Sequence, residues 1–160
     1  MKESNLAKIK NQYISLQKKY KLPSFSELNE DFEIEKLQER ETDFLLRNVR
    51  RMITEKISNV LRFLELILNP SETPTPLFVF AMLKNISPET RKEIEVLYRK
   101  LSSIELSSLS LDINYNEKKE AELIKGIVKS WPKIKEGLGN ITEKLEMAWS
   151  KEKPERKYLG

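Results

Sequence analysis

The sequence predicts an all-α fold, a single compact domain of five to seven helices around one long central helix. Its 160 residues include only four glycines. A chain with few glycines that is rich in Lys, Glu, Leu and Ile favours helices over turn-rich β folds. Apolar residues recur at intervals of three and four along most of the chain, which is the period of an amphipathic helix. The composition, 39% apolar and 34% charged, is that of one globular domain.

The first helix is predicted from a stripe of apolar residues spaced by three and four. These are Leu6, Ile9, Tyr13, Leu16 and Tyr20. We expect this helix to end at Leu22, because the residue before a proline is disfavoured in the helical conformation. Ser24, which opens the segment "SFSELNEDF", is a helix start signal and predicts one short helical turn.

The central helix is predicted over residues 34–68, which contain neither Gly nor Pro. Its apolar stripe consists of Ile34, Leu37, Phe44, Leu45, Val49, Met52, Ile53, Ile57, Val60, Leu61, Leu64 and Leu68. An unbroken helix of this length would extend roughly 50 Å at 1.5 Å per residue. We therefore expect the other helices to pack against it.

A proline-rich corner follows in the segment "NPSETPTPLFVFAML", residues 69–83. Thr75 and Pro76 fit an N-cap with proline at the first helical position, which predicts a short helix. We expect the apolar side chains of this helix to pack into the core. They are Leu77, Phe78, Phe80, Met82 and Leu83. The alternative is an exposed plug that binds a partner through the first three of these residues.

A further helix is predicted after the start signal Ser87-Pro88-Glu89, which is followed by a regular apolar stripe. The stripe consists of Ile94, Leu97, Tyr98, Leu101 and Ile104 and can be extended to Leu109. Residues 109–115 then alternate apolar and polar side chains, which is a strand signal. Because a single strand would have nothing to pair with, we expect an extended connection here.

The C-terminal third predicts one helix that is interrupted by Pro132. Asn116 is expected to cap it, with Glu117 and Glu120 in the first turn, where acids interact favourably with the helix dipole. Pro132 is expected to kink or restart it. The final stripe consists of Ile134, Leu138, Ile141, Leu145 and Trp149. Residues 151–160 have no such stripe and predict a flexible charged tail, which leaves residues 1–150 as the domain.

The two tryptophans, Trp131 and Trp149, are expected in the core. Trp149 lies beside the charged tail, so it is the better candidate for an interface anchor. Together with Leu77, Phe78 and Phe80 it forms the predicted partner-binding set.

The chain has no cysteine and no histidine. Disulfides, thiol nucleophiles, Ser-His-Asp triads and the usual zinc sites are thereby excluded. We expect no catalytic residues, no metal site and no cofactor. No run of 18 apolar residues is present and the N-terminus lacks the apolar core of a signal peptide. A cytoplasmic protein without a membrane span is therefore expected.

Three arginines of the predicted central helix lie opposite its apolar stripe and could bind phosphate. Arg47 follows Asp43 by four residues, and Arg51 precedes Glu55 by four. These two arginines therefore have expected partners within the helix. Arg50 is left as the exposed cation without a partner.

A second basic cluster surrounds Tyr20, which lies between Lys18, Lys19 and Lys21. Aromatic residues interleaved with lysines are typical of proteins that bind single-stranded nucleic acid. Tyr20 also continues the apolar stripe of the first helix, so core packing explains it equally well. The lysines would then be favourable charges at a helix C-terminus.

The segments "LPSFSELNEDFEIEKL" and "FLLRNVRRMITEKI" resemble a group of small uncharacterised helical archaeal proteins. The resemblance covers most of the chain and implies no function and no functional residues. The high content of Lys and Glu without Cys is also typical of thermophile proteins.

The predicted function is that of a non-enzymatic helical module, a scaffold or interaction protein that binds another protein. The alternative is an accessory protein that binds RNA, DNA or a ribonucleoprotein through its basic helix faces. The formal net charge of +4 is mild for a dedicated nucleic-acid binder. Assembly into a homo-oligomer stays open.

Overall fold

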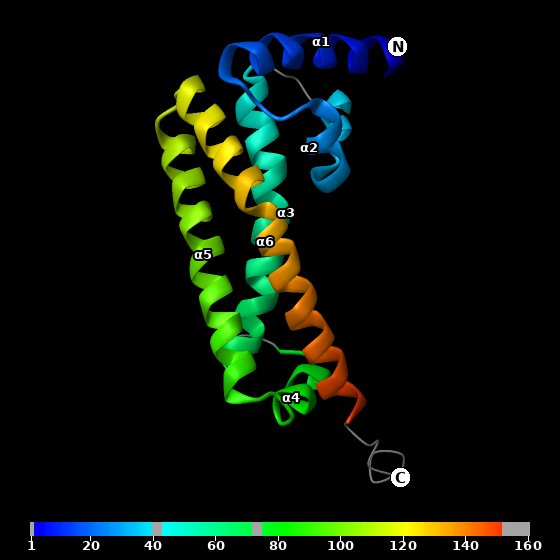
Figure 1. The fold of residues 1–160 in the computed structure, drawn as a ribbon, viewed down its shortest axis with the longest axis vertical. Helices are drawn as coiled ribbons and strands as arrows, with labels where there is room; N and C mark the ends of the chain where they lie inside the picture. Colours follow the sequence, from blue (N-terminus) through cyan, green and yellow to red (C-terminus); the bar gives the residue numbers. More distant parts are fainter. Residues whose placement is uncertain (1, 40–42, 72–74, 152–160) are drawn as a thin grey trace. The chain divides into compact units, whose positions relative to one another are not determined.

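The computed structural model describes residues 2–39, 43–71 and 75–151 of the chain. Within these ranges it contains six α-helices, one short 3-10 helix (η1) and no β-strand, so the all-α class is confirmed (Figure 1). No helix in these ranges is both long enough and apolar enough to span a membrane.

The chain folds into two compact units, each assembled from two segments. The first unit comprises Met1–Asn59 and Ser102–Pro132, and the second comprises Val60–Leu101 and Lys133–Gly160. Three long helices run from one unit into the other: α3 (Leu45–Leu68), α5 (Pro88–Ile113) and α6 (Glu117–Ser150). A single domain over residues 1–150 stays a prediction.

The N-terminal helix α1 (Lys2–Tyr20) is held by buried side chains of its apolar stripe. Ile9 and Tyr13 are almost fully buried. The Tyr13 hydroxyl donates a hydrogen bond of 2.6 Å to the Pro23 carbonyl, which satisfies its polar end as burial requires. The Tyr13 ring also meets the edge of Phe25 with centroids 5.7 Å apart. Sequence and structure therefore agree on this stripe.

The second helix, α2 (Phe25–Phe32), begins with a complete capping box. The Glu27 N–H donates to Ser24 Oγ at 3.1 Å, and the Ser24 N–H donates to Glu27 Oε2 at 2.7 Å. Two helix-terminal donors are thereby satisfied, and the predicted start at Ser24 is confirmed. At the other end of α2, the Phe32 ring packs on Trp131 with centroids 4.9 Å apart.

The predicted continuous helix over residues 34–68 is wrong in its first part. Ile34–Glu39 form the 3-10 helix η1, Asp43 and Phe44 form a turn, and α3 begins only at Leu45; residues 40–42 lie outside the described ranges. The apolar spacing of three between Ile34 and Leu37, both fully buried, fits a 3-10 turn as well as an α-turn. Periodicity alone could not separate the two.

Polar contacts fix the junction between α2 and η1. Glu33 adopts the left-handed conformation with φ of 52°, and its N–H donates to the Asn29 carbonyl. The side chain of Asn29 accepts the N–H of Glu35 at 2.9 Å. The C-terminus of α2 is thus capped by its own residues directly before Ile34.

The C-terminal half departs from the predictions in two places. α5 continues to Ile113, so the extended connection expected over residues 109–115 is wrong for its first five residues. The apolar residues that alternate with polar ones here lie on different sides of the helix: Leu111 is buried, whereas Leu109 and Ile113 are exposed. α6 continues through Pro132, which is exposed, so the predicted restart is wrong. The predicted tail lies outside the described residues apart from Lys151.

The end of α1 has an unusual C-terminal cap. Lys21 adopts the left-handed conformation with φ of 54°, and the Leu22 N–H donates to the Gln17 carbonyl at 3.1 Å. This is the longer hydrogen bond of a Schellman motif, whose left-handed position usually holds glycine. The predicted stop before Pro23 is therefore confirmed, and Lys21 bears the strain.

Replacing Lys21 with glycine should stabilise the protein. Glycine adopts a positive φ without the clash that Cβ causes, so we expect Lys21→Gly to raise the free energy of unfolding by about 0.5–1 kcal/mol. The control Lys8→Gly, in the interior of α1, should lower it by about 1 kcal/mol. Urea titrations followed by circular dichroism measure both. A loss of stability in Lys21→Gly would show that the lysine side chain matters more than the backbone.

Candidate functional site

The arginine predicted to be exposed, Arg50, is fully buried in the first unit, so its assignment as a free phosphate-binding residue is wrong. Its Nε donates to Glu120 Oε2 on α6 at 2.6 Å, and its Nη1 donates to Ser108 Oγ on α5 at 2.6 Å. Its Nη2 donates to Asp112 Oδ1 at 2.7 Å and to the second oxygen of Glu120 at 3.2 Å. The planar guanidinium is thus bonded to both α5 and α6.

The two other arginines join the same acids, which belong to other helices. Arg51 Nε lies 3.0 Å from Asp112 Oδ1, and Arg47 Nε lies 3.9 Å from Glu120 Oε1. The hydrogen bond from Arg50, supported by the one from Arg51, lowers the pKa of Asp112. Three arginines that face two carboxylates form a structural charge cluster, in which little positive charge is left for phosphate.

An aromatic pair lies beside the Arg47 guanidinium. Phe44 and Tyr115 meet edge to face with centroids 4.7 Å apart. The guanidinium carbon of Arg47 lies 4.8 Å from the Tyr115 centroid and 5.6 Å from that of Phe44. These are cation–π distances. These contacts also hold the Arg47 side chain within the fold.

The lysines predicted around Tyr20 are exposed at the end of α1, but they are not a free cluster. Lys19 Nζ and the Tyr20 hydroxyl both donate to Glu117 Oε1, at 2.9 Å and 2.6 Å. These bonds, the one from Tyr20 first, lower the pKa of Glu117. Lys18 and Lys21 are exposed on either side. One of the three lysines in the predicted patch is therefore paired with an acid of the fold.

The apolar corner in the second unit is turned outward, contrary to the predicted packing of Leu77, Phe78 and Phe80. In α4 (Leu77–Leu83) these side chains are 86%, 46% and 43% exposed, whereas Val79 and Met82 are buried. A helix of seven residues can bury only one side. Val79 and Met82 are three residues apart and therefore lie on the same side, which is the buried one.

Trp149 is half-exposed, so its expected place in the core is wrong, whereas Trp131 is buried as predicted. The ring of Phe78 meets the edge of Trp149 with centroids 6.1 Å apart. Two of the four residues in the predicted partner-binding set are therefore brought together on the surface. Exposed aromatic pairs of this kind occur at protein interfaces.

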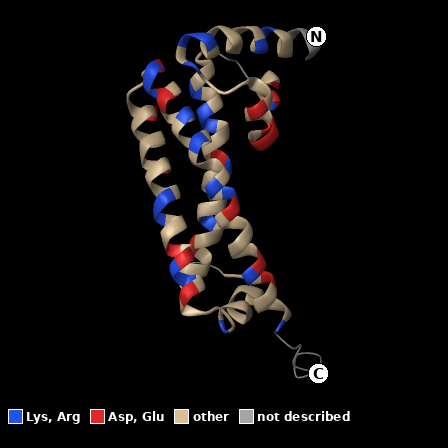
Figure 2. Ribbon diagram, in the orientation of Figure 1, with Lys and Arg blue, Asp and Glu red and all other residues tan. Residues whose placement is uncertain are grey.

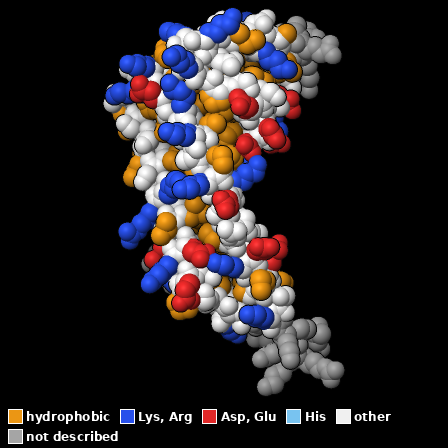
Figure 3. All heavy atoms as spheres, viewed as in Figure 1, with side chains coloured by type: hydrophobic (Ala, Val, Ile, Leu, Met, Phe, Trp, Pro, Cys, Tyr) orange, Lys and Arg blue, Asp and Glu red, His pale blue; other side chains and the backbone are white. Residues whose placement is uncertain are grey.

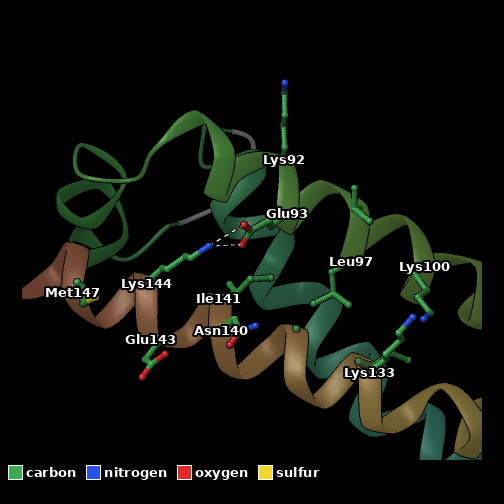
Figure 4. Close-up of a pocket in the computed structure, with 13 residues that line it drawn as sticks. Lys92, Glu93, Leu97, Lys100, Lys133, Asn140, Ile141, Glu143, Lys144 and Met147 are labelled. Atoms are coloured by element: carbon green, nitrogen blue, oxygen red, sulfur yellow. Dashed lines mark hydrogen bonds and ion pairs between the residues drawn. The ribbon is translucent and has the colours of Figure 1, made fainter.

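The second unit contains a groove between α5 and α6 with a volume of about 790 Å³ (Figure 4). Its lining consists of Lys92, Glu93, Val96, Leu97, Lys100, Lys133, Ile134, Gly137, Asn140, Ile141, Glu143, Lys144 and Met147. We call it the α5–α6 groove.

The floor of the α5–α6 groove is apolar and its rim is charged. Leu97, Ile134 and Ile141 are buried at its base, while Val96 and Met147 are 70% and 59% exposed along it. Figure 4 shows the side chains of Leu97 and Ile141 between the two helices. Exposed apolar side chains beside a buried apolar base form the kind of surface that binds another molecule.

The rim carries more positive than negative charge. The lining includes four lysines and two glutamates, which leaves a formal excess of two positive charges (4 − 2). Lys144 Nζ lies 2.7 Å and 2.8 Å from the carboxylate oxygens of Glu93, so this pair bridges the two helices. Lys100 and Lys133 reach the opposite end of the groove in Figure 4.

Gly137 keeps the groove open at its middle. A Cβ built on this residue meets no atom within 4 Å, and the same is true of Gly139, which does not line the groove. A larger side chain at either position therefore has room. The two glycines offer a matched pair for blocking the groove without disturbing the fold.

Sequence reasoning missed the groove, although two of its residues carried a signal. Val96 and Met147 lie outside the apolar stripes predicted for their helices. An apolar residue off the core stripe is normal by itself. Two of them on helices that turn out to be neighbours form a surface, and only the tertiary structure reveals that they are neighbours.

No group of three or more acidic residues in the described ranges is arranged to hold a metal ion. No protein-family model, no curated protein and no solved structure matches the chain. The resemblance to small helical archaeal proteins stays a prediction.

Alanine substitutions in α4 should distinguish its buried side from its exposed side by their effect on stability. Met82→Ala removes a buried side chain, so we expect a loss of about 2–5 kcal/mol in the free energy of unfolding. Leu77→Ala should change it by less than about 0.5 kcal/mol, because the side chain is exposed. Thermal or urea unfolding measures both variants. Equal losses would contradict the outward orientation of Leu77.

The buried charge cluster gives a second stability prediction. Arg50→Ala leaves Glu120 buried without its partner, and we expect a loss of about 3–5 kcal/mol. The double variant Arg50→Met, Glu120→Leu removes both charges and fills the space, so it should recover most of this loss. Urea unfolding of the two variants against the parent protein measures the difference. An Arg50→Ala protein as stable as the parent would show that Glu120 finds another partner.

Proposed function

We propose that the protein is a non-enzymatic interaction module that binds an amphipathic helix of another protein in the α5–α6 groove. The observation that carries the proposal is the groove itself, with a buried apolar floor and the exposed side chains of Val96 and Met147. Grooves between two helices commonly accept the apolar face of a third helix.

The dimensions of the groove fit a short helix. Its lining on α6 extends from Lys133 to Met147, which corresponds to roughly 20 Å of helix at 1.5 Å per residue. About four turns of a bound helix would lie along it. Apolar residues at every third or fourth position of the ligand would then meet the floor.

The charge of the rim favours an acidic ligand. With an excess of lysines at the rim, glutamates and aspartates that flank the apolar face of a bound helix would find opposite charges. Lys100 and Lys133 are the residues best placed for this, because Lys144 is already paired with Glu93. The lysine stems would also cover part of the apolar surface.

Binding of RNA or DNA through basic helix faces is less well supported. Arg50, the central residue of that alternative, is buried, and Arg51 and Lys19 are paired with acids. The α5–α6 groove carries positive charge, but its floor is apolar and lacks the exposed aromatic rings on which bases stack. An oligonucleotide is therefore a suitable competitor in the test.

Two designed peptides test the proposal. Both form amphipathic helices of about four turns with the same leucine face, and one has glutamate and the other lysine on the polar face. We expect the acidic peptide to bind at least about tenfold more tightly, because opposite charges meet at the rim. Fluorescence anisotropy of labelled peptides measures the affinities.

Two pairs of variants locate the binding. Gly137→Leu should fill the groove and weaken the acidic peptide at least about tenfold, whereas Gly139→Leu should leave its affinity unchanged. Lys100→Glu with Lys133→Glu should reverse the preference between the peptides. Equal binding by the two leucine variants would reject the groove. Displacement of the peptide by an RNA or DNA oligonucleotide would favour the nucleic-acid alternative.

A further inference from the structure

One side of α5 in the first unit is apolar and faces outward. Leu106, Leu109 and Ile113 are 68%, 55% and 72% exposed. Their spacing of three and four places them in one line on the helix surface. Ser108 and Leu111, which are buried, define the opposite side of the same segment. We call the three exposed residues the neutral stripe; it shares no residue with the α5–α6 groove.

The α5 segment of the neutral stripe carries little unpaired charge, because Asp112, beside Ile113, is paired with Arg50 and Arg51. Between Lys100 and Asp112 the only ionisable residue is Glu105. Glu105 Oε1 accepts a hydrogen bond of 2.7 Å from Ser58 on α3, and so this acid is engaged within the fold. This part of α5 is mostly free of blue and red in Figure 2. By contrast, lysines and arginines are interspersed with the apolar side chains on the face shown in Figure 3.

Four serines of this segment are also exposed or partly exposed. They are Ser102, Ser103, Ser107 and Ser110. The Ser107 hydroxyl donates to the Ser103 carbonyl within α5 at 3.0 Å, and its oxygen can still accept a hydrogen bond from a second copy. Serine is also small, and two such helices can approach closely between their leucines.

Charge decides which partner fits. The protein carries a formal charge of +4, so two copies repel each other wherever their lysines meet. The neutral stripe is a surface on which one copy can meet another without like charges in contact. A surface that selected a different charged protein would need charges of its own, as the α5–α6 groove has.

We propose that the neutral stripe is a self-association site, through which two copies of the chain pair by their α5 helices about a two-fold axis. In an antiparallel pair, Leu106 of one copy lies beside Leu109 of the second copy, and Ser102 lies beside Ile113. Such an interface is self-complementary and closes at the dimer. The opposed helix dipoles favour this direction.

The size of the stripe sets the strength of the association. The segment from Ser102 to Ile113 corresponds to roughly 18 Å of helix. One helix pair of this length buries less than the roughly 1,200 Å² of a standard stable interface, so the dimer is weak and reversible. Added salt should strengthen it, because salt screens the repulsion between two cationic copies.

Sedimentation equilibrium over about 10 µM to about 1 mM, the range for a small interface, tests the proposal. The average mass of the full chain should rise toward twice the monomer mass. Leu109→Glu should remain monomeric, because two added acids would face the apolar side chains of the partner. Leu77→Glu makes the same change of charge at an apolar position on α4 that is more exposed than Leu109, and it should associate like the parent. Melting curves verify that both variants fold.

A disulfide locates the contact. Because the chain has no cysteine, a mixture of Leu106→Cys and Leu109→Cys chains can form disulfides only between two copies, and it should do so readily if the stripes pair, since these two positions then face each other. Leu77→Cys should cross-link much more slowly. A parent protein that stays monomeric at all concentrations would overturn the proposal. So would loss of association in Leu77→Glu rather than Leu109→Glu, or equal cross-linking in the mixture and in Leu77→Cys.

Discussion

The buried ion pair between Arg50 and Glu120 is the constraint on which the first unit depends. Neither side chain is exposed, and a buried charge is tolerated only when its partner and hydrogen bonds are in place. Bonds from the same guanidinium to Ser108 and Asp112 extend the constraint to α5. Any slip of α3 along α5 or α6 would leave a charge unpaired. The cluster therefore fixes the register of three helices, which apolar packing alone leaves freer.

The same rule of charge explains why the two surface proposals differ in their partners. The α5–α6 groove combines an apolar floor with an excess of lysines, and the proposed function has it discriminate between ligands of opposite charge. The neutral stripe has nothing to attract a charged ligand and nothing to repel its own copy. In both proposals apolar area supplies the attraction, whereas charge, or its absence, selects the partner.

Local signals in the sequence predicted what depends on neighbouring residues. The Ser24 cap, the end of α1 before Pro23 and the burial of Tyr13 follow from residues within a few positions of one another. The partners of Arg50 lie 58 to 70 residues away in the sequence. The search for acids four residues away, which left Arg50 without a partner, could not find them. The predictions for η1 and for the side chains of α4 were wrong for another reason. The spacing of apolar residues predicts one face of a helix, but not the element against which that face packs.

The two proposed surfaces have a joint consequence for binding. A pair of chains joined through the neutral stripe would carry two α5–α6 grooves, and a ligand with two helical segments could occupy both if its linker spans them. The second segment would then bind at a high effective concentration, and the complex would be tighter than either contact alone. Because the pairing is weak, this gain would depend on the protein's own concentration. A weak self-association of a mildly cationic chain would thus set the range in which its groove holds a partner.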